Sequence, residues 1–194
     1  ALLGMASISL RSGRLEEALE TLNQADEINT RLGRVHFLRA TVLFRMGDYL
    51  QGDLALQRAI ENDPQEPDFQ LLSLRRRLMR GETDAVEQSL RRLEEKYPLK
   101  LEVLQLRASL AAVRGDYASA EQLLSQARVT HQSPLLDFSL ARIYYLQRKY
   151  RSVLALTGPL LNQFSGSWEV VYLHALSLAP QQSWEEALEI SEPY

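Results

Sequence analysis

The side chains best suited to catalysis or metal binding are few and widely separated in this sequence. The three histidines are His36, His131 and His174, and no pair has the His-x₃-His or HExxH spacing that places two imidazoles on one helical face. There is no cysteine to act as a nucleophile or ligand. Gly158 and Gly166 stand outside any phosphate-binding or nucleophile-elbow motif. We therefore interpret the histidines as packing or surface residues and expect no metal, no cofactor and no enzymatic activity.

The densest group of charges is the run LRRRLMR at 74–80. A basic helix face of this kind can bind phosphate backbones, but Tyr97 is the only aromatic residue in the window 75–107 that could stack on bases. Three interpretations follow, in order of preference: a solvated helix face, a contact for an acidic protein partner, and a nucleic-acid contact.

Composition sets broad limits on function. The 194 residues are 45% apolar and carry a net charge of −3, a balance that argues against a protein that coats nucleic acid or an anionic membrane. No apolar run approaches the roughly 20 residues of a membrane-spanning helix. The sequence begins at Ala1 within periodic apolar sequence, so we interpret it as an excerpt of a longer protein. The sequence leaves the compartment undecided, with a slight preference for the bacterial cytoplasm or periplasm.

A repeat of fixed length organises the chain. Similar stretches begin near RSGRLEEALETLNQA (11–25), RMGDYLQGDLALQRA (45–59), RGETDAVEQSLRRL (80–93) and RGDYASAEQLLSQA (114–127). The position numbers of their glycines, Gly13, Gly47, Gly81 and Gly115, differ by 34 at each step. Fainter copies follow at 147–160 and 181–194, with Arg148 and Gln182 at the glycine position. A constant period of this size predicts a solenoid of stacked supersecondary units.

Each part of the repeat has a local physical reason. Apolar residues at helical spacing precede every glycine, which predicts a first helix that ends where glycine adopts a left-handed conformation. Asp48 and Asp116 follow, placed to cap a second helix that ends before Pro64 or Pro98. Aromatic residues at matching places can wedge between helices, and small residues at matching places allow close packing. The aromatic set is Tyr49, Tyr117, Tyr150 and Trp184; the small set is Ala6, Ala18, Ala40, Gly52, Ala108, Ala120, Ala141, Ala175 and Ala187.

At these residues the sequence resembles the tetratricopeptide repeat (TPR) family of 34-residue helix–turn–helix units. The resemblance implies an all-α fold, a right-handed α-solenoid of about six repeats near 1–32, 33–66, 67–100, 101–133, 134–167 and 168–194, forming one domain over 1–194. The third repeat departs from the pattern, with Leu74, Val86 and Leu93 at small positions. The fifth begins at Ser133-Pro134, a capping residue before a first-turn proline. A globular helical bundle is the disfavoured alternative.

In this family the first helix of each repeat lines a concave surface that binds a peptide or another protein. The matching positions form an apolar and aromatic row punctuated by arginine. The predicted partner-binding residues are Phe37, Thr41, Arg45, Leu71, Arg75, Gln105, Phe138, Arg142 and Tyr172. For the aromatic members, packing between repeats is an equally open interpretation.

The composition of this row narrows the predicted function. The Lys and Asn residues with which some family members bind a carboxylate are absent, as is the asparagine ladder of others. We predict a non-catalytic scaffold whose groove binds an apolar or amphipathic protein segment with acidic groups. The alternative is a structural spacer or assembly segment of a larger protein, such as a bacterial envelope, polysaccharide-export or secretion component, with self-association through uncapped solenoid ends.

Overall fold

In the computed structural model, the described residues are 1–163, 167–181 and 188, and every regular element among them is a helix. The chain forms two compact units, unit 1 (Ala1–Arg80) and unit 2 (Gly81–Tyr194). The division falls inside the third predicted repeat, the one that carries Leu74 and Val86 at small positions. The all-α prediction is confirmed for the described part of the chain, while one continuous solenoid over 1–194 stays a prediction.

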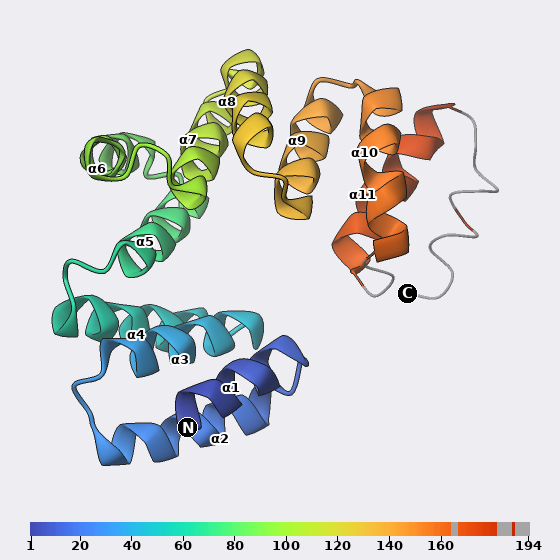
Figure 1. The fold of residues 1–194 in the computed structure, drawn as a ribbon. Coiled ribbons are helices and arrows are strands. Elements are labelled where there is room, and N and C mark those ends of the chain that lie inside the picture. Colours follow the sequence, from blue (N-terminus) through green and yellow to red (C-terminus); the bar gives the residue numbers. More distant parts are fainter. Residues whose placement is uncertain (164–166, 182–187, 189–194) are drawn as a thin grey trace. The chain divides into compact units, whose positions relative to one another are not determined.

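Unit 1 consists of two helical hairpins followed by a single helix (Figure 1). The first hairpin pairs α1 with α2 and the second pairs α3 with α4. The two hairpins pack through α2 against α3, and α5 packs against α4. The helices are α1 (Leu2–Arg11), α2 (Leu15–Ile28), α3 (Gly33–Arg45), α4 (Tyr49–Asn62) and α5 (Pro67–Met79).

Unit 2 begins with the second helix of the third repeat and continues the same alternation. Helix α7 pairs with α8 and α9 with α10, while α11 packs on α10 and contacts α9. Figure 1 shows α9, α10 and α11 side by side. The helices are α6 (Thr83–Lys96), α7 (Leu101–Val113), α8 (Tyr117–Thr130), α9 (Pro134–Leu146), α10 (Tyr150–Gln163), α11 (Trp168–Leu178) and a short 3₁₀ turn, η1 (Ala179–Gln181).

The turns inside the repeats follow the periodic glycines. Gly13, Gly47, Gly81 and Gly115 have φ between 74° and 83°, the left-handed region that glycine enters without steric cost. In the fifth repeat Arg148 takes their place with φ of 59°. The turn geometry is therefore kept even where the favourable residue is missing.

The predicted caps at Asp48 and Asp116 are confirmed. The Asp48 carboxylate accepts a hydrogen bond from the backbone N–H of Gln51 at 3.1 Å, and Asp116 accepts from Ser119 N–H at 3.0 Å. The bonds with Ser119 lower the pKa of the Asp116 carboxyl. Ser133 occupies the N-cap position of α9 before Pro134, but its side chain makes no capping bond.

Small residues lie where helices approach most closely. Ala6, Ala18, Ala40, Ala108, Ala120 and Ala141 are buried. At Gly52 a Cβ atom would lie 2.4 Å and 2.5 Å from two ring carbons of Phe44, so the α3–α4 hairpin has no room for a larger residue. Ala175 is only partly buried. Trp184 and Ala187, the corresponding residues of the sixth repeat, lie outside the described residues.

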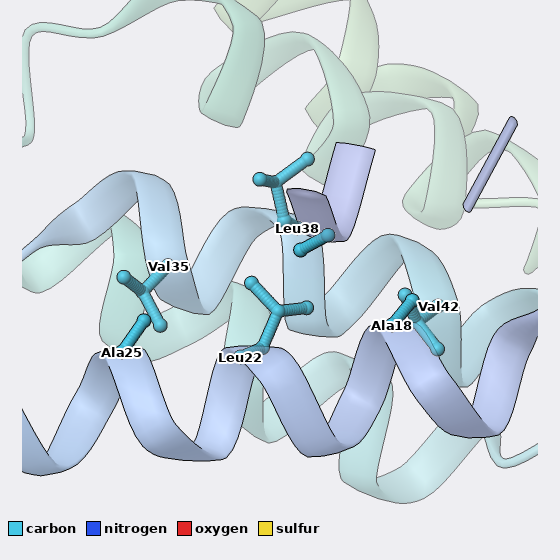
Figure 2. Close-up of a cluster of buried hydrophobic side chains, with 7 residues drawn as sticks. Ala18, Leu22, Ala25, Val35, Leu38 and Val42 are labelled. Atoms are coloured by element: carbon cyan, nitrogen blue, oxygen red, sulfur yellow. The ribbon is translucent and has the colours of Figure 1, made fainter. Parts of the chain in front are cut away.

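The core of the first two repeats shows how one hairpin packs on the next. In Figure 2, Ala18, Leu22 and Ala25 of α2 lie on the side facing α3, with Val35 and Val42 of α3 next to them, and Leu38 of α3 belongs to the same cluster. All six side chains are buried, and they recur at helical spacing on each element. Each Å² of apolar surface removed from water contributes about 25 cal/mol, and this burial is the main force that holds successive repeats together.

Candidate partner-binding site

The nine predicted partner-binding residues differ widely in exposure. Two are buried (Leu71 and Gln105), three are half-buried (Phe37, Thr41 and Phe138) and four are exposed (Arg45, Arg75, Arg142 and Tyr172). A first helix therefore presents only part of the predicted row to solvent. The other residues of the row are wholly or partly covered, because neighbouring helices pack on that side of the first helix.

In unit 1 two of the predicted residues, Phe37 and Arg45, join one repeat to another. The Phe37 ring stacks on Phe69 of α5, with centroids 4.8 Å apart, and the Arg34 guanidinium lies 5.0 Å above it. Arg45 donates from Nη1 to the Leu10 carbonyl at the end of α1, at 2.7 Å. The same carbonyl accepts a hydrogen bond from the Gly13 backbone N–H at 3.3 Å, so Arg45 adds a second donor at the end of α1. Inter-repeat packing is thus the observed role of Phe37.

In unit 2 three first-helix positions from the predicted rows line one hollow. A cavity of about 290 Å³ lies among α7, α8 and α9. Its wall includes Gln105 and Ser109 from α7 and Arg142 from α9. The remaining lining residues are Ala108, Ala112, Val113, Tyr117, Leu124, Ser139, Ile143 and Leu146. The hollow is therefore mostly apolar, with a few polar groups at fixed positions.

The polar groups of this hollow have defined hydrogen-bonding capacity. Ser109 donates to the Gln105 carbonyl and Ser139 to the Leu135 carbonyl, each at 2.8 Å, which leaves both hydroxyl oxygens as acceptors. The Gln105 residue is only 7% exposed, and its side-chain amide makes no hydrogen bond with any described residue. Arg142 is exposed and makes no ion pair within the described part of the chain. Among the described residues that line the wall, it is the one that carries a charge.

Two aromatic residues of α11 are also open to solvent. Trp168 is 59% exposed and Tyr172 is 58% exposed, and their rings lie one helical turn apart with centroids at 6.2 Å. Phe138 of α9, by contrast, packs against a buried cluster that includes Ala141, Val153 and Leu173. Of the predicted aromatic row in unit 2, Tyr172 is the member that a partner can reach most easily.

The basic run 74–80 is not a uniformly solvated face. The Arg76 guanidinium lies 4.5 Å from the centroid of Phe44 and 4.8 Å from that of Tyr49, and it pairs with Asp53 at 3.2 Å. Arg80 pairs with the same carboxylate. These contacts tie α5 to the preceding hairpin. Tyr49, expected to wedge between helices, instead lies beneath Arg76 and is 54% exposed.

A second ion-pair cluster joins α6 to α7 in unit 2. Arg107 donates from Nη1 to Glu87 at 2.8 Å and from Nε to Glu94 at 2.6 Å, and Arg114 donates to Glu87 at 2.9 Å. The hydrogen bond from Arg107 is the main reason that the pKa of Glu87 falls from 4.5 to about 2. The same carboxylates raise the pKa of Arg107. Glu87 also accepts from Arg91 Nε, one turn along its own helix, at 2.9 Å.

Sequence reasoning missed that these acids follow the repeat. Asp53, Glu87 and Glu121 recur with the same period as the turn glycines. Each pairs with a base from the next repeat: Asp53 with Arg80, Glu87 with Arg114, and Glu121 with Lys149 at 2.8 Å. The sequence does hold a signal for these pairs. The acids recur with the repeat period, and a base follows each of them in the next repeat.

Two of the histidines have structural roles. The His36 Nε2 lies 2.9 Å from the Thr30 carbonyl, and because a carbonyl only accepts, Nε2 carries the proton. Thr157 donates to Val153 and contacts His174 Nδ1 at 2.7 Å, so Nδ1 is the donor in that pair. Within the described residues no group of histidines and acids has an arrangement that could hold a metal ion.

The described helices are also too short or too polar to cross a bilayer. None combines 18 residues with the hydropathy that a membrane span needs.

The fold defines a class: arrays of two-helix repeats in which each hairpin packs on the next. Residues 1–31 match the family model described as "Tetratricopeptide repeat". No curated protein sequence is significantly similar to the chain.

Solved structures of tetratricopeptide repeat proteins share the fold over most of the chain. A protein from Parabacteroides merdae has a TM-score of 0.78 at 17% identity, covering 97% of this chain and 74% of that one. TTC0263 from Thermus thermophilus has a TM-score of 0.75 at 18% identity, covering 92% and 97%. YrrB, described as having an unusual peptide-binding site, has a TM-score of 0.52 at 12% identity, covering 88% and 89%. The chain has the tetratricopeptide repeat fold, and the predicted resemblance is confirmed at that level.

Proposed function

We propose that this chain is a non-catalytic scaffold that binds a segment of a partner protein on the first-helix face of unit 2. Tetratricopeptide repeats generally serve as protein–protein interaction scaffolds, and YrrB is described as a peptide-binding member of the class. The observation that carries the proposal is the hollow among α7, α8 and α9, where Gln105, Ser109 and Arg142 meet.

The chemistry of this face supports binding. The wall is mostly apolar, so a partner side chain that enters it gains from the burial of apolar surface. Polar groups at fixed positions give orientation, because each of them needs a partner once water is excluded. The exposed rings of Trp168 and Tyr172 on α11 add the aromatic residues that are enriched at binding hot spots.

Selection from a random library tests the proposal because it does not require the natural partner. Phage-displayed random dodecapeptides are selected on the 194-residue protein. Enriched peptides are then measured against two variants that each add one aromatic ring to an exposed position of the fourth repeat. Ser109→Tyr fills the hollow, whereas Gln122→Tyr lies on the second helix, α8, away from its wall.

The expected result is that selected peptides bind wild type and Gln122→Tyr equally and lose at least tenfold in affinity for Ser109→Tyr. Circular dichroism confirms that both variants keep their helix content. Equal binding to all three proteins, or no enrichment of any peptide, would show that this face is not the binding surface.

A further inference from the structure

We infer that the turn between α9 and α10 binds a ligand with two neighbouring phosphate groups, held by Arg148, Lys149 and Arg151. The site is distinct from the proposed partner-binding face, because its lining shares no residue with the hollow among α7, α8 and α9. Three observations support it: the chemistry of a second hollow, the reversed charge of this turn, and the lack of nearby acids that would neutralise it.

The second hollow, of about 600 Å³, lies where α10 begins. It is lined by Arg148, Lys149, Tyr150, Arg151 and Ser152. Three of these side chains are cationic and the other two carry hydroxyl groups, so each of the five can donate a hydrogen bond. Among these lining residues there is no carboxylate and no aliphatic side chain. Arginine, lysine, serine and tyrosine are the side chains that commonly donate to phosphate oxygens, so the lining has the chemistry of a phosphate site.

The charge of this turn is opposite to that of the earlier turns. In each of the first four repeats, the turn glycine and the four residues after it carry a net negative charge. In the fifth repeat the same positions run from Arg148 to Ser152 and hold three cations and no acid. Lys149 occupies the position of the capping acids Asp48 and Asp116. The turn therefore lacks the carboxylate that would compete with a bound anion.

No acid of the same hairpin neutralises these cations. The sequence from 138 to 168 holds four bases and neither Asp nor Glu, although the whole chain has a net charge of −3. Arg148 and Arg151 are exposed and make no ion pair within the described part of the chain. A local excess of one charge attracts ligands of the opposite charge and speeds their association.

Lys149 is held in place by contacts with two residues. Its Nζ lies 2.8 Å from the Glu121 carboxylate and 5.3 Å from the centroid of the Tyr144 ring. The hydrogen bond from Lys149 lowers the pKa of Glu121. An ammonium group has three N–H donors, so Lys149 can bind an anion without releasing Glu121. The two arginines supply the charge that this acid does not balance.

Arg148 is kept in a conformation that arginine disfavours. Its φ of 59° lies in the left-handed region, where the first four repeats have glycine. Glycine would make the same turn with less strain, so the backbone geometry alone does not call for arginine. Strained residues are concentrated at ligand sites, and a guanidinium that contacts an anion gives the Arg148 side chain such a role.

The number of cations favours two linked phosphates over a carboxylate. A carboxylate has one negative charge and two oxygens, whereas a phosphate monoester has roughly 1.5 to 2 charges and three free oxygens. A nucleic acid strand suits the turn less well, because successive bases need a row of rings on which to stack. Tyr150 is the single ring of the lining, and Tyr145 contacts it at a centroid distance of 5.8 Å.

The test is an NMR titration of the ¹⁵N-labelled 194-residue protein with sodium pyrophosphate. The amide shifts give both the affinity and the location of the bound anion. Orthophosphate has a single phosphate, and citrate has several carboxylates and no phosphate, so both serve as comparison ligands at equal ionic strength. The variants are Arg148→Gly and Arg151→Gln. Arg92→Gln, which removes an exposed cation from α6, is the matched control.

We expect pyrophosphate to shift the amides of Lys149 to Ser152 and to bind at least fivefold more tightly than citrate or orthophosphate. Arg148→Gly and Arg151→Gln should each weaken pyrophosphate binding at least fivefold, since hydrogen bonds to charged groups contribute that much. Arg92→Gln should have no effect. Because Arg148→Gly relieves the strain of the turn, unfolding does not explain a loss of binding by that variant.

Three results would overturn the inference: equal affinity for citrate and pyrophosphate, shifts confined to residues outside the turn, or equal weakening by Arg92→Gln. Each would mean that the protein attracts anions without a phosphate site at this turn.

Vesicles distinguish a soluble ligand from a lipid headgroup. Cosedimentation compares phosphatidylcholine vesicles with and without phosphatidylinositol bisphosphate, whose ring carries two neighbouring phosphates. Binding to the bisphosphate vesicles that is lost in Arg148→Gly and Arg151→Gln would identify a headgroup. Pyrophosphate binding without vesicle binding would identify a soluble ligand. If neither binds, the inference is wrong, and the proposed partner-binding face is unaffected.

Discussion

At the residue scale, Arg148 is the one described non-glycine residue with positive φ, at the position where earlier repeats have glycine. A non-glycine residue in the left-handed region destabilises the folded state by about 1–2 kcal/mol. Glycine removes this strain, but it also gives the unfolded chain more conformational freedom, which offsets part of the gain in stability. We expect Arg148→Gly to raise the free energy of unfolding by up to about 1 kcal/mol. Urea denaturation, monitored by circular dichroism, measures the free energy of unfolding of both proteins.

The reverse change at Gly115, where φ is 81°, is the control. Gly115→Ala should lower the free energy of unfolding by about 1 kcal/mol. A lower stability of Arg148→Gly, or an unchanged stability of Gly115→Ala, would contradict this explanation of the turns.

Glu87 gives the protein a specific response to acid. Its pKa is lowered from 4.5 to about 2, chiefly by the hydrogen bond from Arg107, so its carboxylate stabilises the folded state above about pH 5. That contribution is lost as the pH falls from about 5 to about 2. We expect Glu87→Gln to lose on the order of 2 kcal/mol at pH 7, and the difference from wild type to shrink towards pH 2.

Glu95→Gln, an exposed change on the same helix, controls for the loss of one negative charge. Urea titrations at several pH values compare the three proteins. A constant difference between wild type and Glu87→Gln across the pH range would mean that the ion-pair cluster does not contribute as described.

At the scale of elements, the approach of α3 to α4 depends on Gly52. Because an added Cβ would lie 2.4 Å from a ring carbon of Phe44, Gly52→Ala forces that ring or the helix to move. We expect a loss of about 1–3 kcal/mol in thermal or urea unfolding, as for other overpacked sites.

Gly4 in α1 is a matched control, since no atom lies within 4 Å of its added Cβ. Gly4→Ala should stabilise the helix by about 0.5–1 kcal/mol, because alanine favours a helix interior over glycine. Equal effects of the two substitutions would mean that helix propensity, not packing, determines the outcome at Gly52.

Much of the arrangement of helices could be predicted from the sequence because it depends on local chemistry that recurs in each helical hairpin. Gly47 and Gly115 end first helices, and Asp48 and Asp116 cap second helices, through interactions within a few residues. The turn at Arg148 was harder to predict, because arginine disfavours positive φ. The packing of the neighbouring helices imposes that conformation on the backbone there.

The candidate site could be predicted only in part. The row positions located Gln105 and Arg142 on first helices, but whether such a residue is exposed depends on how its helix rotates against the next repeat. Leu71 is accordingly buried and Phe37 stacks on Phe69, although both occupy the same row as the exposed Tyr172. The pairing of Glu87 with Arg107 likewise requires knowledge of how α6 docks on α7.

At the scale of the whole molecule, solution mass separates the two functions predicted from the sequence. A scaffold that captures peptides is expected to sediment as a monomer of 22.1 kDa. A spacer or assembly segment would form end-to-end oligomers whose mass rises with concentration. Sedimentation velocity over a hundredfold range of concentration makes this comparison, and oligomers would favour the structural alternative.

The most direct test of the account is photo-crosslinking of a selected dodecapeptide that carries benzoyl-phenylalanine next to its aliphatic residue. If a partner segment lies against the first helices of unit 2, mass spectrometry should place the crosslinks within Leu101–Val113 and Pro134–Leu146. Ser109→Tyr should abolish them and Gln122→Tyr should not. Crosslinks confined to second helices or to unit 1, or crosslinks unaffected by Ser109→Tyr, would contradict the account.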